Sequence, residues 1–406
     1  MTRQPRLRAV FCALLIAGFA GYGPSAGAQG SVRPEVGKPL QAAQALLKHR
    51  KGREAMAEIA KAEAVPNRTA FENQVIAQMK AAAASASGDY DATIRANGSL
   101  LASGKVTGRD ALTLVQGIAV AHYSKKEYGE AARWTQRYFK DGGTDASMRT
   151  MLLQSYYLGN DCNSVNKMLG SAVDENSSRK PTEEELQILA NCYLRSRDTG
   201  GYVGAIEKLV VFYPKKEYWT DLLARVQKKP GFSDRLGVHV YRLRFATGNL
   251  TSAADYMEMA QLAVQTGVPA EAKAVIDRGY AAGVLGKGDQ AGRHGRLRDL
   301  VEKALAESQK NRAAAEAEAA AAKDGDGLVK VGLNYVYEGN PSKGFPLIEQ
   351  GIRKGGLKRP EDAKLRLGEA QLQAGQKQRG VQTLREVKGS DGAADIARLW
   401  VLHARA

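Results

Sequence analysis

Residues that could bind a metal are scattered along this chain of 406 residues. A histidine zinc site needs its ligands at short spacing, as in the HExxH arrangement on one helix face. No histidine here lies in such an arrangement or close to a second histidine. The histidines are His49, His122, His239, His294 and His403. We therefore predict no metal-binding residues.

Other segments resemble reactive or ligand-binding motifs only in part. Gly286–Gly292 is rich in glycine but has neither the Walker nor the dinucleotide spacing. Asp324-Gly-Asp326 begins like a calcium loop, but the later acidic ligands are missing. The acids Glu183 to Glu185 open a predicted helix, where the helix dipole accounts for them, and GxSxG is absent. We predict no enzyme activity, no catalytic residues and no cofactor.

The elements that hold these residues are predicted to be helices. In segment 112–139, apolar and small residues recur every three or four positions, stop at Ser124–Glu127 and then resume. Ala119 and Ala131 lie twelve residues apart, one on each side of this break. Because neither residue is bulky, the two helices can cross closely as an antiparallel pair.

The same pair recurs along nearly the whole chain. A small residue opens the second helix at Ala55, Thr93, Ala131, Ser164 and Ala205, at intervals of 38, 38, 33 and 41 residues. Near the C-terminus, Gly332 and Gly368 are 36 residues apart, and Gly344 and Gly380 follow each of them by twelve. This recurrence predicts an all-α solenoid in which each helix pair packs on the next.

These residues resemble the tetratricopeptide repeat (TPR) family, which pairs two helices in each repeat of about 34 residues. The resemblance is carried by Leu367-Gly368 with Gly380 and Leu384, and by Gly88-Asp89-Tyr90 at the start of a second helix. It covers most of residues 40–387, although the aromatic residue after Leu-Gly and the closing proline are often absent. It implies a right-handed α-solenoid of TPR-like helix pairs, here of an exported bacterial type.

The first 28 residues are predicted to be a signal peptide. Basic residues precede a short apolar run, Ala9–Ala20, and Ala26-Gly27-Ala28 forms a small-residue cleavage site. The mature chain would begin at Gln29 in the periplasm, without a membrane span. Removing this segment lowers the formal charge from +16 to +13. That excess favours anionic partners, although the basic residues are spread through most segments.

The predicted domain order follows the repeats. Residues 29–39 form a leader, 40–288 an N-terminal TPR-like solenoid, and 324–406 C-terminal TPR-like repeats with a capping helix. Between them, residues 289–323 read as one long connecting helix rich in alanine and glutamate.

We interpret the chain as a non-enzymatic periplasmic scaffold that docks protein partners, through a peptide or a helix, in a cell-envelope assembly. Secretion, outer-membrane biogenesis and polysaccharide export are the assemblies considered. The alternative is direct binding of an anionic envelope glycan or polymer through the basic surface. Export argues against nucleic acid as a partner.

A disulfide is predicted between Cys162 and Cys192, the only cysteines outside the signal peptide. One begins the second helix of a pair and the other lies late in the first helix of the next pair. In an up-down-up stack these two positions lie at the same end, and an oxidising compartment favours the bridge. Two separately buried thiols are the alternative.

The resemblance also implies a partner-binding groove lined by first-helix residues off the buried face. With Ala119, Leu152 and Ala190 as the close-packing points of three consecutive pairs, nine positions line it. They are Thr113, Gln116, Tyr123, Arg149, Tyr156, Tyr157, Gln187, Asn191 and Arg195. Amide, tyrosine and arginine side chains suit an extended peptide. The alternative is that the tyrosines pack between neighbouring helices.

Overall fold

The computed structural model describes residues 31–170 and 179–406, and within these ranges every regular element is helical. The predicted all-α solenoid of helix pairs is therefore confirmed, because each helix packs chiefly on its neighbours in sequence. The predicted signal peptide and its cleavage site lie outside the described residues. The chain divides into two compact units, Met1–Ser177 and Ser178–Ala406, and the predicted boundary at residue 288 lies inside the second.

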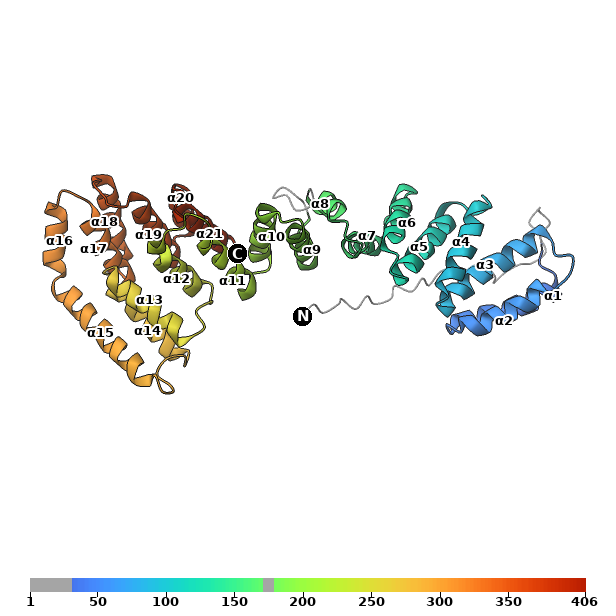
Figure 1. The fold of residues 1–406 in the computed structure, drawn as a ribbon, viewed down its shortest axis with the longest axis horizontal. Helices are drawn as coiled ribbons and strands as arrows, with labels where there is room; N and C mark the ends of the chain where they lie inside the picture. The colour runs from blue at the N-terminus through green and yellow to red at the C-terminus, as the bar shows by residue number, and fades with distance from the viewer. Residues whose placement is uncertain (1–30, 171–178) are drawn as a thin grey trace. The chain divides into compact units, whose positions relative to one another are not determined.

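Over residues 31–170, the first unit contains four helix pairs (Figure 1). Pro34 begins the first helix inside the predicted leader, as proline suits the first helical position. The helices are α1 (Pro34–Lys48), α2 (Gly52–Glu63), α3 (Ala70–Ser87), α4 (Tyr90–Ala102), α5 (Gly108–Ser124), α6 (Tyr128–Lys140), α7 (Ala146–Leu158) and α8 (Cys162–Gly170).

Over residues 179–406, the second unit contains further pairs and three other helices. The pairs are α9 (Glu183–Arg195) with α10 (Thr199–Phe212), α11 (Lys216–Gln227) with α12 (Gly237–Ala246), α13 (Ala253–Gln265) with α14 (Pro269–Ala281), α17 (Asp326–Tyr337) with α18 (Pro341–Lys354), and α19 (Pro360–Gln373) with α20 (Lys377–Arg385). The remaining helices are α15 (Ala291–Lys310), α16 (Arg312–Ala321) and α21 (Ala393–Arg405).

A left-handed residue in the turn of each pair fixes the repeat register. Such a residue satisfies the last carbonyls of the first helix, as Lys126 N does by donating to Tyr123 O at 2.9 Å. Successive turn residues lie 34 to 38 positions apart, except where α15 and α16 replace a pair. They are Arg50, Gly88, Lys126, Asn160, Arg197, Gly231, Gly267, Gly339 and Gly375.

The glycine pairs predicted near the C-terminus do allow close helix crossing. A methyl group on Gly332 would lie 2.7 Å from the carbonyl oxygen of Gly344, across the contact between α17 and α18. A methyl group on Gly380 would lie 3.1 Å from the carbonyl oxygen of Gly368, across the next pair. Only a hydrogen in place of Cβ lets these backbones approach so closely.

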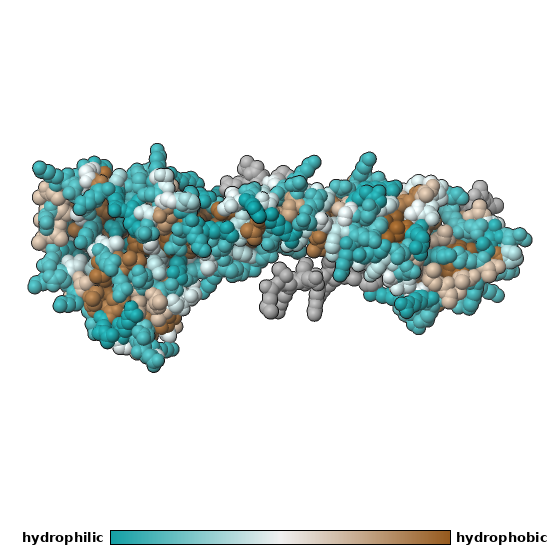
Figure 2. All heavy atoms as spheres, in the orientation of Figure 1, coloured by the Kyte–Doolittle hydropathy of each residue, from teal (hydrophilic) through white to brown (hydrophobic). Residues whose placement is uncertain are grey.

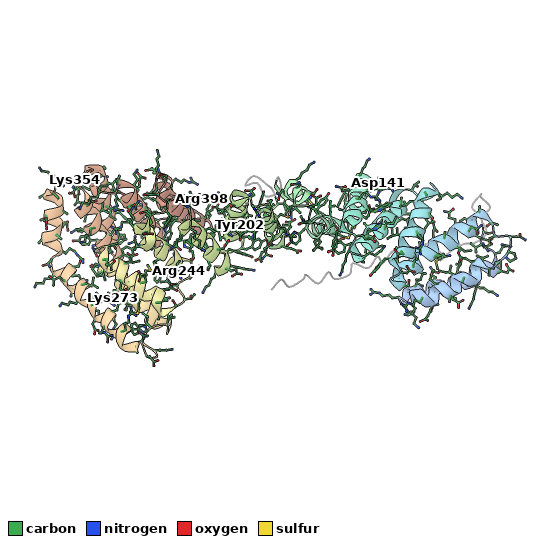
Figure 3. All side chains as sticks on the ribbon, in the orientation of Figure 1. Asp141, Tyr202, Arg244, Lys273, Lys354 and Arg398 are labelled. Carbon is green, nitrogen blue, oxygen red and sulfur yellow. The ribbon has the colours of Figure 1, made fainter. Side chains whose placement is uncertain are left out.

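Residues 289–323, expected to form one connecting helix, form α15 and α16, which meet at Asn311. The second of these is not simply exposed. Ala319 is buried and packs with Leu328 of α17, while Arg312 pairs with Glu338. Lys354 of α18, labelled in Figure 3, donates to the Ala320 carbonyl at 2.8 Å. Alanine buries little area, but its small size lets α16 lie close against α17.

The C-terminal helices of the second unit pack on its middle helices. α21 contacts α10 and α12, and α17 contacts α14 (Figure 1). Ion pairs join residues far apart in sequence: Lys229 with Asp395 at 2.8 Å, and Arg398 (Figure 3) with Glu207. The predicted capping helix therefore also joins two layers of this unit.

Candidate functional site

The surface with the best-defined site geometry lies on α5 and α7 of the first unit. Residues that lie at equal distances before the turn residues Lys126 and Asn160 point to the same side of α5 and α7. We call these positions the first-helix face: Thr113, Gln116, Val120 and Tyr123 of α5, and Ser147, Thr150, Gln154 and Tyr157 of α7. The two helices are joined there by the Tyr123 hydroxyl, which donates to Gln154 Oε1 at 3.0 Å.

The first-helix face carries no formal charge, although a quarter of the chain's residues are charged. Val120 is 41% exposed, one of the few large apolar residues so open among the described residues. The Tyr123 ring is held edge-on to Tyr128, with centroids 5.6 Å apart. Hydroxyl, amide and aromatic groups therefore share one face, of which only Gln154 is buried, at 7% exposure. Figure 2 shows that hydrophilic residues predominate on the side of the molecule turned to the viewer.

Four predicted groove residues, Thr113, Gln116, Tyr123 and Tyr157, belong to the first-helix face, whereas Arg149 and Tyr156 do not. The turn residues Lys126 and Asn160 are 34 positions apart, which makes Leu153, not Leu152, the counterpart of Ala119. A shift of one residue turns a helical side chain by about 100°. Arg149 and Tyr156 consequently lie on a different side of α7, towards α6 and α8.

There they line a surface hollow of about 440 Å³, which we call the α6–α8 hollow. Its lining residues are Gln136, Phe139, Arg149, Leu152, Tyr156, Ser164, Lys167 and Met168. Tyr156 is 9% exposed, and Gln136 Nε2 donates to its hydroxyl. Burial raises the pKa of this hydroxyl, so Tyr156 stays neutral.

The other three predicted groove residues lie on α9 of the second unit, and all are exposed. Gln187 Nε2 donates to the Tyr218 hydroxyl at 2.7 Å, and Asn191 Nδ2 donates to the Gln187 carbonyl at 2.9 Å. Burial and the neighbouring Glu183 raise the pKa of Tyr218 to about 12. Gln187 and Asn191 hold positions of α9 that match Thr150 and Gln154 of α7, whereas Arg195 lies outside this register.

The predicted cysteines fall in different units, with Cys162 at the start of α8 and Cys192 fully buried in α9. Their pairing stays a prediction.

The structure also contains a buried ion cluster that the sequence did not predict, in the second unit. Arg242 of α12 donates from Nε and Nη2 to the two oxygens of Glu271, at 2.7 Å each. Its Nη1 lies 3.3 Å from Glu369 of α19, which also accepts from Trp400 Nε1 at 2.8 Å and lies 2.9 Å from His239 Nδ1. All five side chains are at most 2% exposed.

Electrostatics keeps the central pair of this cluster ionised. Burial opposes ionisation of Glu271, but the charge and hydrogen bonds of Arg242 outweigh it and lower the pKa of that carboxyl. The same attraction raises the pKa of Arg242. Because these groups are enclosed and bonded to one another, we assign the cluster to holding α12, α14, α19 and α21 together.

The cluster also covers the face of α19 that corresponds to the first-helix face. Glu369 lies six residues before the turn residue Gly375, as Val120 lies six before Lys126. On α17 the corresponding residue, Leu333, is 1% exposed and packs in a cluster with Val268. These C-terminal repeats therefore present their first-helix side to helices of their own chain.

The described ranges contain neither a cluster of metal ligands nor a membrane-spanning helix. There, no group of three or more His, Cys, Asp or Glu side chains could hold a metal ion. Likewise, none of the helices in residues 31–170 and 179–406 combines the length and the apolar character that crossing a membrane requires.

No protein-family model matches the sequence, and no curated protein matches it. Among solved structures, the chain is similar to the crystal structure of yeast Tom70, at 11% identity and a TM-score of 0.26. The match covers 91% of this chain and 95% of that chain. Because identity and TM-score are both low, the fold is assigned from the helix pairs themselves.

Proposed function

We propose that the chain is a non-enzymatic scaffold that docks protein partners on the first-helix face of α5 and α7. The observation that carries this proposal is that the face is uncharged and, apart from the buried Gln154, at least partly exposed, in a chain with a formal charge of +16. An occupant rich in charge would find no counter-charge there. An extended, uncharged peptide segment would instead meet hydroxyl groups and the Gln116 amide, able to bond its backbone, and tyrosine rings able to contact its side chains.

The contrast within the molecule supports an extended segment rather than an apolar helix. Where helices cover the equivalent positions of α17 and α19, these positions are large and apolar or join a buried ion pair, as Leu333 and Glu369 do. The positions on α5 and α7 are mostly hydroxyls and amides. Such groups bury little apolar area, so backbone hydrogen bonds would supply most of the specificity.

The proposal includes export to the periplasm, with cleavage after Ala28, and a role in an envelope assembly such as secretion, outer-membrane biogenesis or polysaccharide export. It rests on the composition of residues 1–28. N-terminal sequencing of the protein from the envelope fraction should read from Gln29. An intact Met1 would contradict export by a cleaved signal.

The proposed Cys162–Cys192 bridge belongs to the same expectation of an oxidising compartment. It would close a loop of 30 residues and contribute about 3–4 kcal/mol in the chain-entropy model. Unfolding the protein without reductant should leave both thiols unreactive to iodoacetamide. Complete alkylation of both would exclude the bridge.

Peptide binding tests the docking face. Uncharged 12-residue peptides and versions bearing two glutamates or two lysines would be titrated into the chain at 50 and 500 mM salt. We expect the uncharged peptides to bind with little dependence on salt, and Tyr123→Ala to weaken them at least tenfold. The matched control is Tyr90→Ala, which removes a 40% exposed tyrosine at the start of α4.

The alternative, an anionic polymer held by the basic surface, is favoured by the net charge alone. Its binding should fall steeply with salt, because each released counterion contributes to the dependence. Salt-sensitive binding of an anionic polysaccharide, together with uncharged peptides that bind equally to the natural chain and to Tyr123→Ala, would support that alternative and overturn docking on the first-helix face.

A further inference from the structure

The α6–α8 hollow differs from the first-helix face in both shape and charge. Its apolar lining comes from three helices: Phe139 of α6, Leu152 of α7 and Met168 of α8. Such a mixture of an aromatic ring, a branched chain and a flexible thioether accommodates one large apolar side chain. The volume of about 440 Å³ is sufficient for a short peptide segment.

The hollow's charges are both positive. Arg149 and Lys167 line it from α7 and α8, and none of its eight lining residues is acidic. The nearest acid along α8 is Asp161, whose Oδ1 accepts from Ser164 N at 3.0 Å at the start of that helix. This carboxylate is therefore engaged in capping, where it also complements the helix dipole.

Its polar centre is neutral and ordered. Gln136 and Tyr156 are bonded to each other, which fixes both side chains in the lining. A ligand that enters can therefore place an acceptor on the two cations and an apolar group on the apolar side chains.

We propose that the α6–α8 hollow binds a protein segment in which a large apolar side chain lies beside an acidic one. The apolar side chain packs on Phe139, Leu152 and Met168, and the carboxylate is bound by Arg149 and Lys167. This is a second docking site, on a different side of α7 from the first-helix face. It selects for an acidic side chain, whereas the uncharged first-helix face does not. The two sites let one scaffold distinguish two kinds of partner segment.

The test uses the full mature chain and two six-residue probe peptides, blocked at both ends. One carries a glutamate next to a phenylalanine, and the other carries glutamine in place of the glutamate. We expect calorimetry at 50 mM salt to show about fivefold tighter binding of the glutamate peptide, equivalent to about 1 kcal/mol. The preference should disappear in Arg149→Gln/Lys167→Gln and at 500 mM salt. Arg133→Gln/Lys140→Gln, which removes two exposed cations of α6, should retain it.

A Met168→Ser variant tests the apolar lining, and should weaken both peptides equally. Circular dichroism of each variant shows whether α6 to α8 remain folded. Equal binding of the two peptides, or binding of neither, overturns the proposal. Because Tyr123→Ala acts on the other site, it should leave this preference unchanged, so the two proposals fail separately.

Discussion

The first-helix side of α5 and α7 and the first-helix side of α17 and α19 hold the same positions of the same repeat. In the first unit these positions are uncharged and mostly polar, and all but Gln154 are at least partly exposed, with Val120 41% exposed. In the second unit Leu333 and Glu369 are each 1% exposed and contact the chain's own α12, α21 and the turn before α14. The repeat therefore provides a surface, and its side chains decide whether that surface is left open or is used to close the fold.

We call the first-helix side of α5 and α7 the open side, and that of α17 and α19 the closed side. The variant with the largest expected effect removes Arg242, which holds the closed side together. Arg242→Ala should lower the free energy of unfolding of the second unit by about 3–5 kcal/mol, because Glu271 would stay buried without its bidentate partner. Chemical denaturation followed by tryptophan fluorescence measures it, since Trp219 and Trp400 both lie in this unit.

Arg133→Ala is the control for that loss, as its pairing with Glu130 is exposed and contributes within about 0.5 kcal/mol. Equal stability of the two variants would show that the cluster does not hold the layers.

A second test acts on the helix crossing that builds the closed side. Gly332→Ala places a methyl group 2.6 Å from Ile348 Cγ1 and 2.7 Å from the Gly344 carbonyl oxygen. We expect α17 and α18 to be pushed apart and the unit to lose about 1–3 kcal/mol of stability.

The matched change is Gly295→Ala in α15, where the added methyl meets no atom within 4 Å. It should stabilise the chain by about 0.5–1 kcal/mol, since alanine favours a helix over glycine. The same sign for both variants in thermal melts would contradict the crossing geometry.

Much of this architecture could be predicted from the sequence because it depends on local spacing. Ala119 with Ala131, and Gly332 with Gly344, mark helix pairs by size alone. The register of a single pair was harder to predict, because Leu152 and Leu153 are both leucines and both buried, and only the left-handed turn at Asn160 distinguishes them. This difference of one residue places Arg149 and Tyr156 in the α6–α8 hollow instead of the predicted groove.

The buried ion cluster could not be predicted from spacing. His239 and Arg242 lie one helical turn apart, yet Glu369 is more than 120 residues away, and its contact depends on how α19 packs on α12. From the sequence alone, a charged residue at a groove position is predicted to face solvent, because the helix that covers it is not known. The polar residues of α5 and α7 fitted that expectation because no described helix covers them.

The third test uses pH to measure the contribution of Glu72, a buried carboxylate of the first unit. Glu72 is enclosed, but its partner Arg33 is 40% exposed, and hydrogen bonds from Arg33 lower the pKa of Glu72 to about 2. Because the folded pKa lies below the ordinary value of 4.5, the stabilisation is complete above pH 4.5 and is lost as the pH falls towards 2.

Melting temperature between pH 2 and pH 6 should therefore fall more steeply for the natural chain than for Glu72→Gln. Parallel curves would show that this carboxylate does not stabilise the first helix pairs.

The smallest expected effect is that of Tyr123→Phe on the open side. It removes only the hydroxyl that donates to Gln154 and should cost about 0.5–1.5 kcal/mol of stability. Thr144→Ala, in the exposed turn between α6 and α7, is the comparison and should change stability little. A loss above about 3 kcal/mol would mean that Tyr123 is chiefly a packing residue.

The most direct test of the open and closed sides places a diazirine analogue of leucine at position 120 or position 333 and illuminates the protein in its native envelope. We predict that the label at Val120 crosslinks to another protein at both low and high salt. The label at Leu333 should crosslink within the chain, to the segment around Val268. Partner crosslinks from Leu333, with only intrachain products from Val120, would contradict this prediction.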